Sequence, residues 1–211
     1  MKVKVCGNIL PEQVNALDEA GVQLAGFVFY PGSPRYVRPK ITPEKMKQIR
    51  GKIARVGVFV NARYDELMKT IEDYRLDMVQ LHGDEDPRYC ERIADYISVI
   101  KVFRLAGNEN LEPLTIPYNA VCDFFMFDTA GTGYGSMGKK FNWELLHQHP
   151  PSKPYMLGGG IEAADIGNLL DFIQSPAAEK LFAVDINSKF EISPGVKDIN
   201  KIKNFMRQLN V

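Results

Sequence analysis

Short apolar runs alternate with longer amphipathic segments along nearly the whole chain. The apolar runs have the length of buried strands, whereas the segments between them carry apolar residues at helical spacing. The pattern predicts strands at residues 2–6, 24–29, 55–60, 77–81, 99–103, 124–127, 155–157 and 181–185. It predicts helices at residues 11–20, 42–51, 64–74, 86–96, 141–147, 163–173 and 196–209.

Strands separated by helices favour parallel pairing, because each helix carries the chain back along the sheet. In 211 residues this repeat predicts a (β/α)8 TIM barrel, a single domain over residues 1–211 that is near the lower size limit of the fold. A doubly wound open sheet is the alternative. Residues 108–120 contain Pro113 and Pro117 and lack helical periodicity, so we expect the fifth helix to be short or replaced by a loop.

The charges of the chain balance, with 26 Lys and Arg against 26 Asp and Glu. No net field would therefore attract nucleic acid or an anionic membrane, and an anionic ligand needs a local site. No window approaches the roughly 20 apolar residues that span a bilayer. The three cysteines are odd in number and lack metal-ligand spacing, which argues against a disulfide framework and structural zinc and favours the cytoplasm.

Candidate chemistry gathers where the predicted strands end, and both folds bind ligands at the carboxyl ends of parallel strands. The polar residues at or just after these ends include Cys6, Arg35, His82, Asp128, Asp185, Asn187 and Ser188. A lone cysteine in a strand is usually an inert buried residue, and a histidine at a strand end is usually a hydrogen-bonded structural residue. Their shared position at one edge makes them candidates here.

Two loops have the features of a phosphate site. Glycines 158–160 follow the seventh strand, so the bare backbone N–H groups of Gly159 and Gly160 could approach an anion closely. Asn187 and Ser188 follow the eighth strand, and (β/α)8 barrels often bind phosphate with these two loops. A glycine run alone more often forms a plain turn, but its position after the seventh of eight strands favours phosphate binding.

Another glycine pattern, Gly133-Tyr-Gly-Ser-Met-Gly138, matches the dinucleotide fingerprint G-x-G-x-x-G. The match is weak, because the glycines begin five residues past Asp128 and no acidic strand end lies about twenty residues further on. We interpret residues 130–140 as a loop over the site, either a lid or a solvated linker. His147 and His149 precede two prolines at a helix end, so we expect them on the surface, and no metal site is predicted.

Several phrases of the sequence resemble the phosphoribosylanthranilate isomerase family. They are Lys4-Val-Cys-Gly-Asn8, Gly26-Phe-Val-Phe-Tyr-Pro31, Ser33-Pro-Arg-Tyr-Val37, Arg55-Val-Gly-Val-Phe-Val-Asn61, Val79-Gln-Leu-His-Gly83, Phe127-Asp-Thr129 and Pro194-Gly-Val-Lys-Asp198. The resemblance covers nearly the whole chain. It implies a (β/α)8 barrel enzyme of tryptophan biosynthesis that converts N-(5-phosphoribosyl)anthranilate into 1-(2-carboxyphenylamino)-1-deoxyribulose 5-phosphate, an Amadori rearrangement without metal or cofactor.

The resemblance also implies roles for individual residues. Asp128 resembles the general acid, Cys6 the general base, and Arg35 the residue that pairs with the anthranilate carboxylate. We assign His82 and Asp185 to substrate binding and the four loop residues Gly159, Gly160, Asn187 and Ser188 to the phosphate.

The residues around the acid and base support these roles physically. Asp128 follows Phe124-Phe-Met-Phe127, and apolar surroundings raise a carboxyl pKa toward the range in which the group holds a proton. A thiol is largely protonated at neutral pH, and Lys4 lies on the same strand face as Cys6. We therefore hypothesise that Lys4 favours the Cys6 thiolate.

Two stretches depart from the usual family pattern. They are Gly135-Ser-Met-Gly-Lys139 with Phe141-Asn-Trp143, and Val184-Asp-Ile-Asn-Ser-Lys-Phe-Glu191, in which Lys189 replaces a usual glycine. Another sugar-phosphate barrel enzyme and a non-catalytic sugar-phosphate-binding barrel remain alternatives. The histidine-pathway Amadori isomerase uses two aspartates, whereas the first strand here ends in Cys6. The expected partner is a small phosphorylated substrate, and the chain is a monomer or a homodimer.

Overall fold

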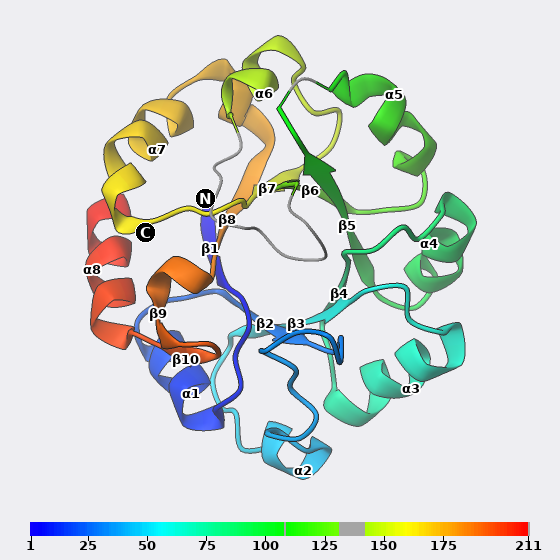
Figure 1. The fold of residues 1–211 in the computed structure, drawn as a ribbon, viewed down its shortest axis with the longest axis vertical. Helices are drawn as coiled ribbons and strands as arrows, with labels where there is room; N and C mark the ends of the chain where they lie inside the picture. The colour runs from blue at the N-terminus through cyan, green and yellow to red at the C-terminus, as the bar shows by residue number, and fades with distance from the viewer. Residues whose placement is uncertain (108, 131–141, 211) are drawn as a thin grey trace.

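Eight parallel strands close into a barrel surrounded by helices in the computed structural model, which describes residues 1–107, 109–130 and 142–210 (Figure 1). The strands are β1 Lys2–Val5, β2 Leu24–Val28, β3 Ala54–Phe59, β4 Met78–Leu81, β5 Ser98–Leu105, β6 Phe124–Thr129, β7 Tyr155–Leu157 and β8 Leu181–Ile186. The barrel closes because β1 also pairs with β8, with Lys4 opposite Asp185. The predicted (β/α)8 barrel is confirmed, and the open sheet is wrong.

The helices lie outside the barrel, one after nearly every strand (Figure 1). They are α1 Pro11–Glu19, α2 Pro43–Met46, α3 Tyr64–Tyr74, α4 Pro87–Ala94, α5 Leu111–Thr115, α6 Glu144–Gln148, α7 Ile166–Ile173 and α8 Ile199–Leu209. The expectation of a short fifth helix is confirmed. Helix α5 ends at Thr115 and continues only as a 3-10 turn, Ile116–Tyr118, because Pro117 has no N–H for the next helical bond.

Helix α2 is shorter than the predicted span of residues 42–51. The start is as expected, since Thr42 caps it with Pro43 at the first position. After Met46 the chain continues in single turns, with Gln48 N donating to Lys45 O and Ile49 N to Met46 O, and side chains of α1 then accept from the backbone that follows. Asn15 Oδ1 accepts from Arg50 N at 2.8 Å and Asp18 Oδ1 accepts from Lys52 N at 3.0 Å.

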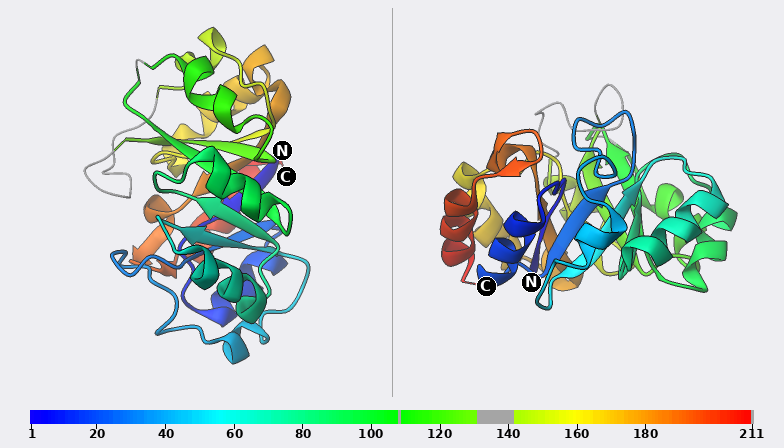
Figure 2. Two further views of the ribbon diagram at one scale, coloured as in Figure 1. Left: turned by 90° about the vertical axis from the view of Figure 1, so that its right-hand side faces the viewer. Right: turned by 90° about the horizontal axis from the view of Figure 1, so that it is seen from below.

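The predicted final helix at residues 196–209 is wrong at its start. Val196–Lys197 form strand β10, which pairs antiparallel with β9, Glu191–Ser193. Asp198 then caps α8 by accepting from Lys201 N at 3.0 Å. In Figure 2 this hairpin lies at the end of the barrel opposite the chain termini, which is the mouth formed by the carboxyl ends of the strands.

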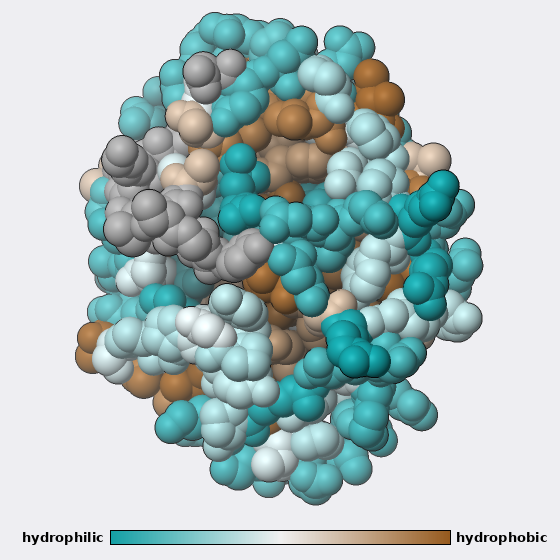
Figure 3. All heavy atoms as spheres, turned by 45° about the vertical axis from the view of Figure 1, so that its right-hand side comes forward, coloured by the Kyte–Doolittle hydropathy of each residue, from teal (hydrophilic) through white to brown (hydrophobic). Residues whose placement is uncertain are grey.

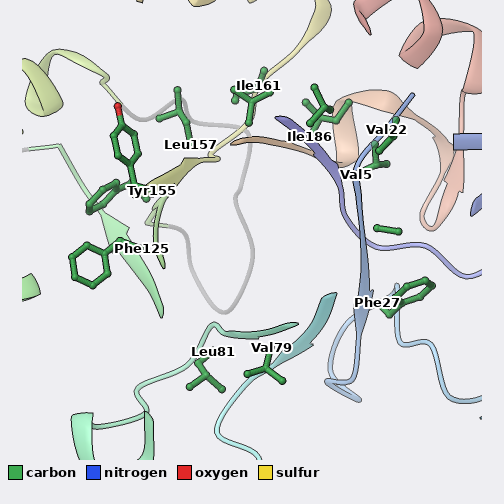
Figure 4. Close-up of a cluster of buried hydrophobic side chains, with 14 of the residues drawn as sticks. Val5, Val22, Phe27, Val79, Leu81, Phe125, Tyr155, Leu157, Ile161 and Ile186 are labelled. Carbon is green, nitrogen blue, oxygen red and sulfur yellow. The ribbon is translucent and has the colours of Figure 1, made fainter. Parts of the chain in front are cut away.

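Two apolar layers fill the molecule. Side chains on the outer strand faces, including Phe27, Leu81 and Phe125, pack against the helices (Figure 4). The barrel interior holds a separate cluster of Leu24, Val56, Met78, Ile100, Val102, Met126, Met156 and Ala183. Because side chains alternate along a strand, the inward positions nearer the mouth are those of the polar residues described below.

The face shown in Figure 3 is largely hydrophilic, with hydrophobic residues mainly in recesses between polar ones. Within the described ranges, no helix combines the length and the hydropathy needed to cross a membrane.

Candidate active site

The nine residues selected from the sequence meet at a single cavity at the mouth of the barrel. They are Cys6, Arg35, His82, Asp128, Gly159, Gly160, Asp185, Asn187 and Ser188. Tyr30, Ser33, Gln80 and Ile161 also line this cavity. The meeting follows from the closed barrel, which brings the ends of β1, β4, β6, β7 and β8 to one opening.

Cys6 lies directly after β1 and is 5% exposed. The chain makes room for its thiol at Gly26, where an added Cβ would lie 2.8 Å from Cys6 Sγ. Burial raises the pKa of the Cys6 thiol, the charge of Lys4 opposes that shift, and Asp185 adds to it. The thiol therefore sits in the cavity as a weak acid that is mostly protonated at neutral pH.

Lys4 is fully buried one layer below Cys6 and pairs with Asp185, with Nζ 2.8 Å from Oδ1. Burial lowers the pKa of Lys4, but Asp185 and Cys6 outweigh burial and raise it. Burial raises the pKa of Asp185 and the Lys4 charge opposes this. Lys4 acts on the Cys6 pKa in the direction that we hypothesised, although burial exceeds its effect.

Asp128 lies on β6 and is 8% exposed. Burial raises the pKa of its carboxyl group to about 6, against a smaller opposing effect of the Thr129 backbone N–H, which donates to Oδ1 at 2.7 Å. The raised pKa has the direction predicted from the sequence, but its cause is burial of the carboxyl group at the barrel mouth, since Phe125 and Phe127 belong to the outer apolar layer. A carboxyl group with such a pKa can hold a proton near neutral pH and release it.

His82 lies between Gln80 and Asp128. Its Nδ1 is 3.0 Å from Gln80 Nε2, and its Nε2 is 3.5 Å from Asp128 Oδ2. Burial and then the charge of Lys4 lower the pKa of His82 to about 3, so the ring is neutral at physiological pH. A neutral ring whose Nδ1 accepts from Gln80 carries its proton on Nε2, facing Asp128.

Arg35 reaches the cavity from the loop after β2. Its side chain passes over Gly7, where an added Cβ would lie 2.4 Å from Arg35 Cδ. The positive φ of Gly7, 77°, also favours glycine there. The guanidinium pairs with Glu191, with Nη2 2.6 Å from Oε2.

Sequence reasoning missed Glu191 and Lys197 as site residues. Glu191 is on β9 and Lys197 is on β10, and their side chains form an ion pair at 2.6 Å. Because residues 196–209 were predicted as one helix, Lys197 was not expected to lie near the barrel mouth. The signal that could have revealed it is the Pro194-Gly195 pair, a turn sequence between two short polar segments.

The predicted phosphate loops lie together at one side of the cavity. Gly159 and Gly160 have φ values of 87° and 76°, which favour glycine and turn the backbone amides out of the strand direction. Ser188 begins a 3-10 turn, Ser188–Phe190, directly after Asn187. Lys189 lies in this turn, and its carbonyl oxygen accepts from Lys201 Nζ at 2.6 Å.

Two expectations concern other parts of the chain. The interpretation of residues 130–140 as a loop over the site, together with the glycine pattern at 133–138, falls at 131–140 outside the described residues. His147 is exposed, as expected. In residues 1–107, 109–130 and 142–210, no group of three His, Cys, Asp or Glu side chains has a geometry that could hold a metal ion.

The closed (β/α)8 barrel carries a thiol, a protonatable carboxyl group and two glycine- or amide-rich loops at one mouth. This combination is typical of enzymes that act on small phosphorylated substrates. Residues 3–208 match the family described as N-(5'phosphoribosyl)anthranilate (PRA) isomerase, and the chain belongs to this family. It is therefore an isomerase of tryptophan biosynthesis that carries out an aldose–ketose rearrangement.

Relatives of known name agree over the full length. The chain is 38% identical to the N-(5'-phosphoribosyl)anthranilate isomerase of Phocaeicola vulgatus, with 99% of this chain and 98% of the relative covered. It is 37% identical to the enzyme of the same name from Parabacteroides distasonis, covering 99% and 93%.

Solved structures agree as well. The phosphoribosyl anthranilate isomerase of Thermotoga maritima superposes with a TM-score of 0.85 at 32% identity, covering 100% of this chain and 98% of that one. A phosphoribosyl anthranilate isomerase solved in complex with reduced 1-(o-carboxyphenylamino)-1-deoxyribulose 5-phosphate gives 0.79 at 30% identity, again covering 100% and 98%.

Proposed function

We propose that Asp128 and Cys6 are the acid and the base of the Amadori rearrangement of N-(5-phosphoribosyl)anthranilate in this chain. The observation that supports the proposal is their meeting at one cavity, which seven other residues chosen for the same substrate also line. The remaining parts of the substrate are then assigned to the groups that surround the pair.

Asp128 acts first, by giving its proton to the oxygen of the furanose ring. The bond between that oxygen and C1 breaks, and the nitrogen lone pair forms the C=N bond of an iminium ion. A solvated aspartate would be ionised at neutral pH and could not donate, whereas burial holds the pKa of Asp128 at about 6.

Cys6 acts second, as a thiolate that removes the proton from C2. The electrons of the C2–H bond form a C1=C2 double bond and neutralise the iminium nitrogen. The resulting enaminol becomes the aminoketose when the C2 hydroxyl loses its proton and C1 gains one. Lys4 supports the thiolate, because its positive charge lowers the pKa of Cys6 against the effect of burial.

The other groups hold the substrate between these two. Arg35 binds the anthranilate carboxylate, since a guanidinium suits a planar carboxylate. The backbone N–H groups of Gly159 and Gly160, with Asn187 and Ser188, bind the phosphate. His82, neutral and facing Asp128, and Asp185, paired with Lys4, contact the sugar hydroxyls.

The test generates the labile aminoaldose in situ and follows the loss of its anthranilate fluorescence. Cys6→Ser and Asp128→Asn are expected to lower kcat by at least ~10²-fold, as for a positioned acid or base. Arg35→Ala is expected to raise KM with a smaller change in kcat. Normal turnover by Cys6→Ser would remove the thiol from the mechanism, and turnover absent from the wild type would favour a sugar-phosphate-binding barrel.

The setting of the enzyme stays a prediction. One solved relative, the phosphoribosylanthranilate isomerase of Thermotoga maritima, is described as dimeric. We propose for this chain a monomer or a homodimer in the cytoplasm, which sedimentation of the purified protein and cell fractionation would test.

A further inference from the structure

We propose that Glu191 is a positioning residue for substrate selection: it holds the Nε–Nη2 edge of the Arg35 guanidinium so that the remaining Nη1–Nη2 edge receives the substrate carboxylate. The inference rests on the proposed role of Arg35 and goes beyond it, because it gives the direction of approach and a second residue on which recognition depends.

The contact between the two side chains is two-pronged. Arg35 Nε donates to Glu191 Oε1 at 2.9 Å and to Oε2 at 3.1 Å, and Nη2 donates to Oε2 at 2.6 Å. The Nε and Nη2 edge of the fork is therefore occupied. Among the residues that the structure describes, Nη1 has no hydrogen-bond partner, and Arg35 lines the cavity. A substrate carboxylate would meet the edge formed by Nη1 and the second hydrogen of Nη2.

Glu191 is itself held from two further directions. Gly195 N donates to Oε1 at 2.9 Å across the β9–β10 turn, and Lys197 Nζ donates to the same oxygen at 2.6 Å. The Glu191 side chain is 4% exposed. A carboxylate with three kinds of donor and little solvent has one preferred orientation, so it fixes the guanidinium that it binds.

Lys197 connects this pair to the rest of the mouth. Its ammonium donates to the Cys6 carbonyl oxygen and, at 2.9 Å, to Asn187 Oδ1. Through Glu191 and Lys197 the hairpin β9–β10 thus contacts the end of β1, Arg35 and the loop proposed for phosphate. Arg35 and Lys197 both pair with the single carboxylate of Glu191. The three side chains therefore keep one net positive charge for the substrate carboxylate.

A purely structural role for Glu191 would affect all substrates alike. Positioning of Arg35 predicts instead that the loss depends on whether the substrate has a carboxylate. The experiment therefore compares two aminoaldoses made in situ from ribose 5-phosphate, one with anthranilate and one with aniline, which lacks only the carboxylate.

Glu191→Gln is expected to lower kcat/KM for the anthranilate substrate by about 10- to 100-fold, as misplacement of a binding group does. For the aniline substrate the expected loss is within about threefold, because its binding energy does not involve Arg35. The effect on the anthranilate substrate is expected mainly in KM. Glu66→Gln is the matched control, since Glu66 pairs with Arg38 at 3.0 Å on the exposed surface, and it should leave both substrates unchanged.

Arg35→Met separates the failure of the inference from the failure of the proposed function. If Arg35→Met discriminates between the two substrates and Glu191→Gln lowers both equally, the positioning role is overturned while the role of Arg35 stands. If Arg35→Met lowers kcat/KM equally for the anthranilate and aniline substrates, the proposed role of Arg35 and the positioning role of Glu191 are both overturned. Should Glu191→Gln fail to fold, Glu191→Asp is measured instead. It keeps the charge beside Lys197 but withdraws it from Arg35 by one methylene, and equal losses on both substrates would again overturn the inference.

Discussion

Lys4 and Asp185 form a buried ion pair across the seam that closes the barrel, with Nζ 2.8 Å from Oδ1. The two residues are register partners on β1 and β8, so the pairing exists only when the first and last strands meet. The pair lies next to the Cys6 thiol and acts on its pKa with both signs, because Lys4 lowers it and Asp185 raises it.

The first prediction follows from these opposite signs. Lys4→Met is expected to raise the pKa of Cys6 further, and Asp185→Asn is expected to lower it. The measurement is the rate of Cys6 alkylation by iodoacetamide against pH, in proteins in which Cys90 and Cys122 are replaced by alanine. Movement of both midpoints in the same direction, or an unchanged profile in Lys4→Met, would contradict this account.

The second prediction concerns the pH dependence of kcat/KM. In the proposed mechanism the active form has Asp128 protonated and Cys6 ionised, yet the Asp128 pKa is about 6 and burial raises the Cys6 pKa above its ordinary value. The profile should be bell-shaped, with a rising limb whose midpoint near pH 6 belongs to Asp128 and a falling limb in the alkaline range that belongs to Cys6. Only a small fraction of the free enzyme then has both groups in the required state, because the acid has the lower pKa of the two.

Two direct titrations check that assignment. The thiolate midpoint from alkylation should coincide with the falling limb, and a midpoint near pH 6 would reverse the assignment. The substrate phosphate also titrates near pH 6, so the Asp128 carboxyl is followed by ¹³C NMR of the free enzyme. His82 does not interfere, because its pKa is about 3.

The third prediction is that the ionised Asp128 carboxylate lowers the free energy of unfolding. The pKa of Asp128 is higher in the folded state, about 6, than its ordinary value of 3.8, so the folded state binds the proton more tightly. The contribution of protonated Asp128 to the free energy of unfolding is complete below pH 3.8. It is lost as the pH rises through 6. Asp128→Asn removes the ionisation and can still accept from Thr129 N.

The Asn variant should therefore be more stable than the wild type by on the order of 2–3 kcal/mol at pH 8, and the difference should vanish below pH 4. Urea unfolding at both pH values measures it. A difference that does not change with pH would mean that Asp128 is ionised normally in the fold.

The fourth prediction concerns the space for the thiol. A Cβ on Gly26 would lie 2.8 Å from Cys6 Sγ and 3.0 Å from Cys6 Cα, and the backbone atom cannot move aside cheaply. Gly26→Ala is expected to destabilise the protein by about 1–3 kcal/mol and to lower kcat by displacing Cys6, the proposed base. Thermal unfolding and turnover are measured together.

Gly167→Ala is the control for that substitution. Gly167 lies in α7 with no atom within 4 Å of its added Cβ. The change should stabilise the helix by roughly 0.5–1 kcal/mol and leave turnover unchanged. Equal behaviour of the two variants would show that Gly26 is not required by close approach to Cys6.

The periodicity of the chain by itself determined the number and order of the eight barrel strands and most of the helices between them. Eight apolar runs separated by helical segments can bury their strands on both faces only if helices cover the outside, and a parallel sheet of eight strands then closes. The same rule predicted where Cys6, His82, Asp128 and Asp185 would gather, because the carboxyl ends of parallel strands face one way. The predicted direction of the Asp128 pKa shift agrees with the structure, in which burial at the barrel mouth causes it.

Tertiary structure decided what depends on long-range neighbours. The backbone that follows α2 is held by Asn15 and Asp18 of another helix, and the Cys6 pKa depends on a balance of burial against charges on β1 and β8. The Arg35–Glu191–Lys197 cluster joins residues up to 162 positions apart in sequence, and no local periodicity encodes such a contact. Propensity and pattern act over a few residues, whereas hydrogen bonds, burial and ion pairs are fixed only when the closed barrel brings distant segments together.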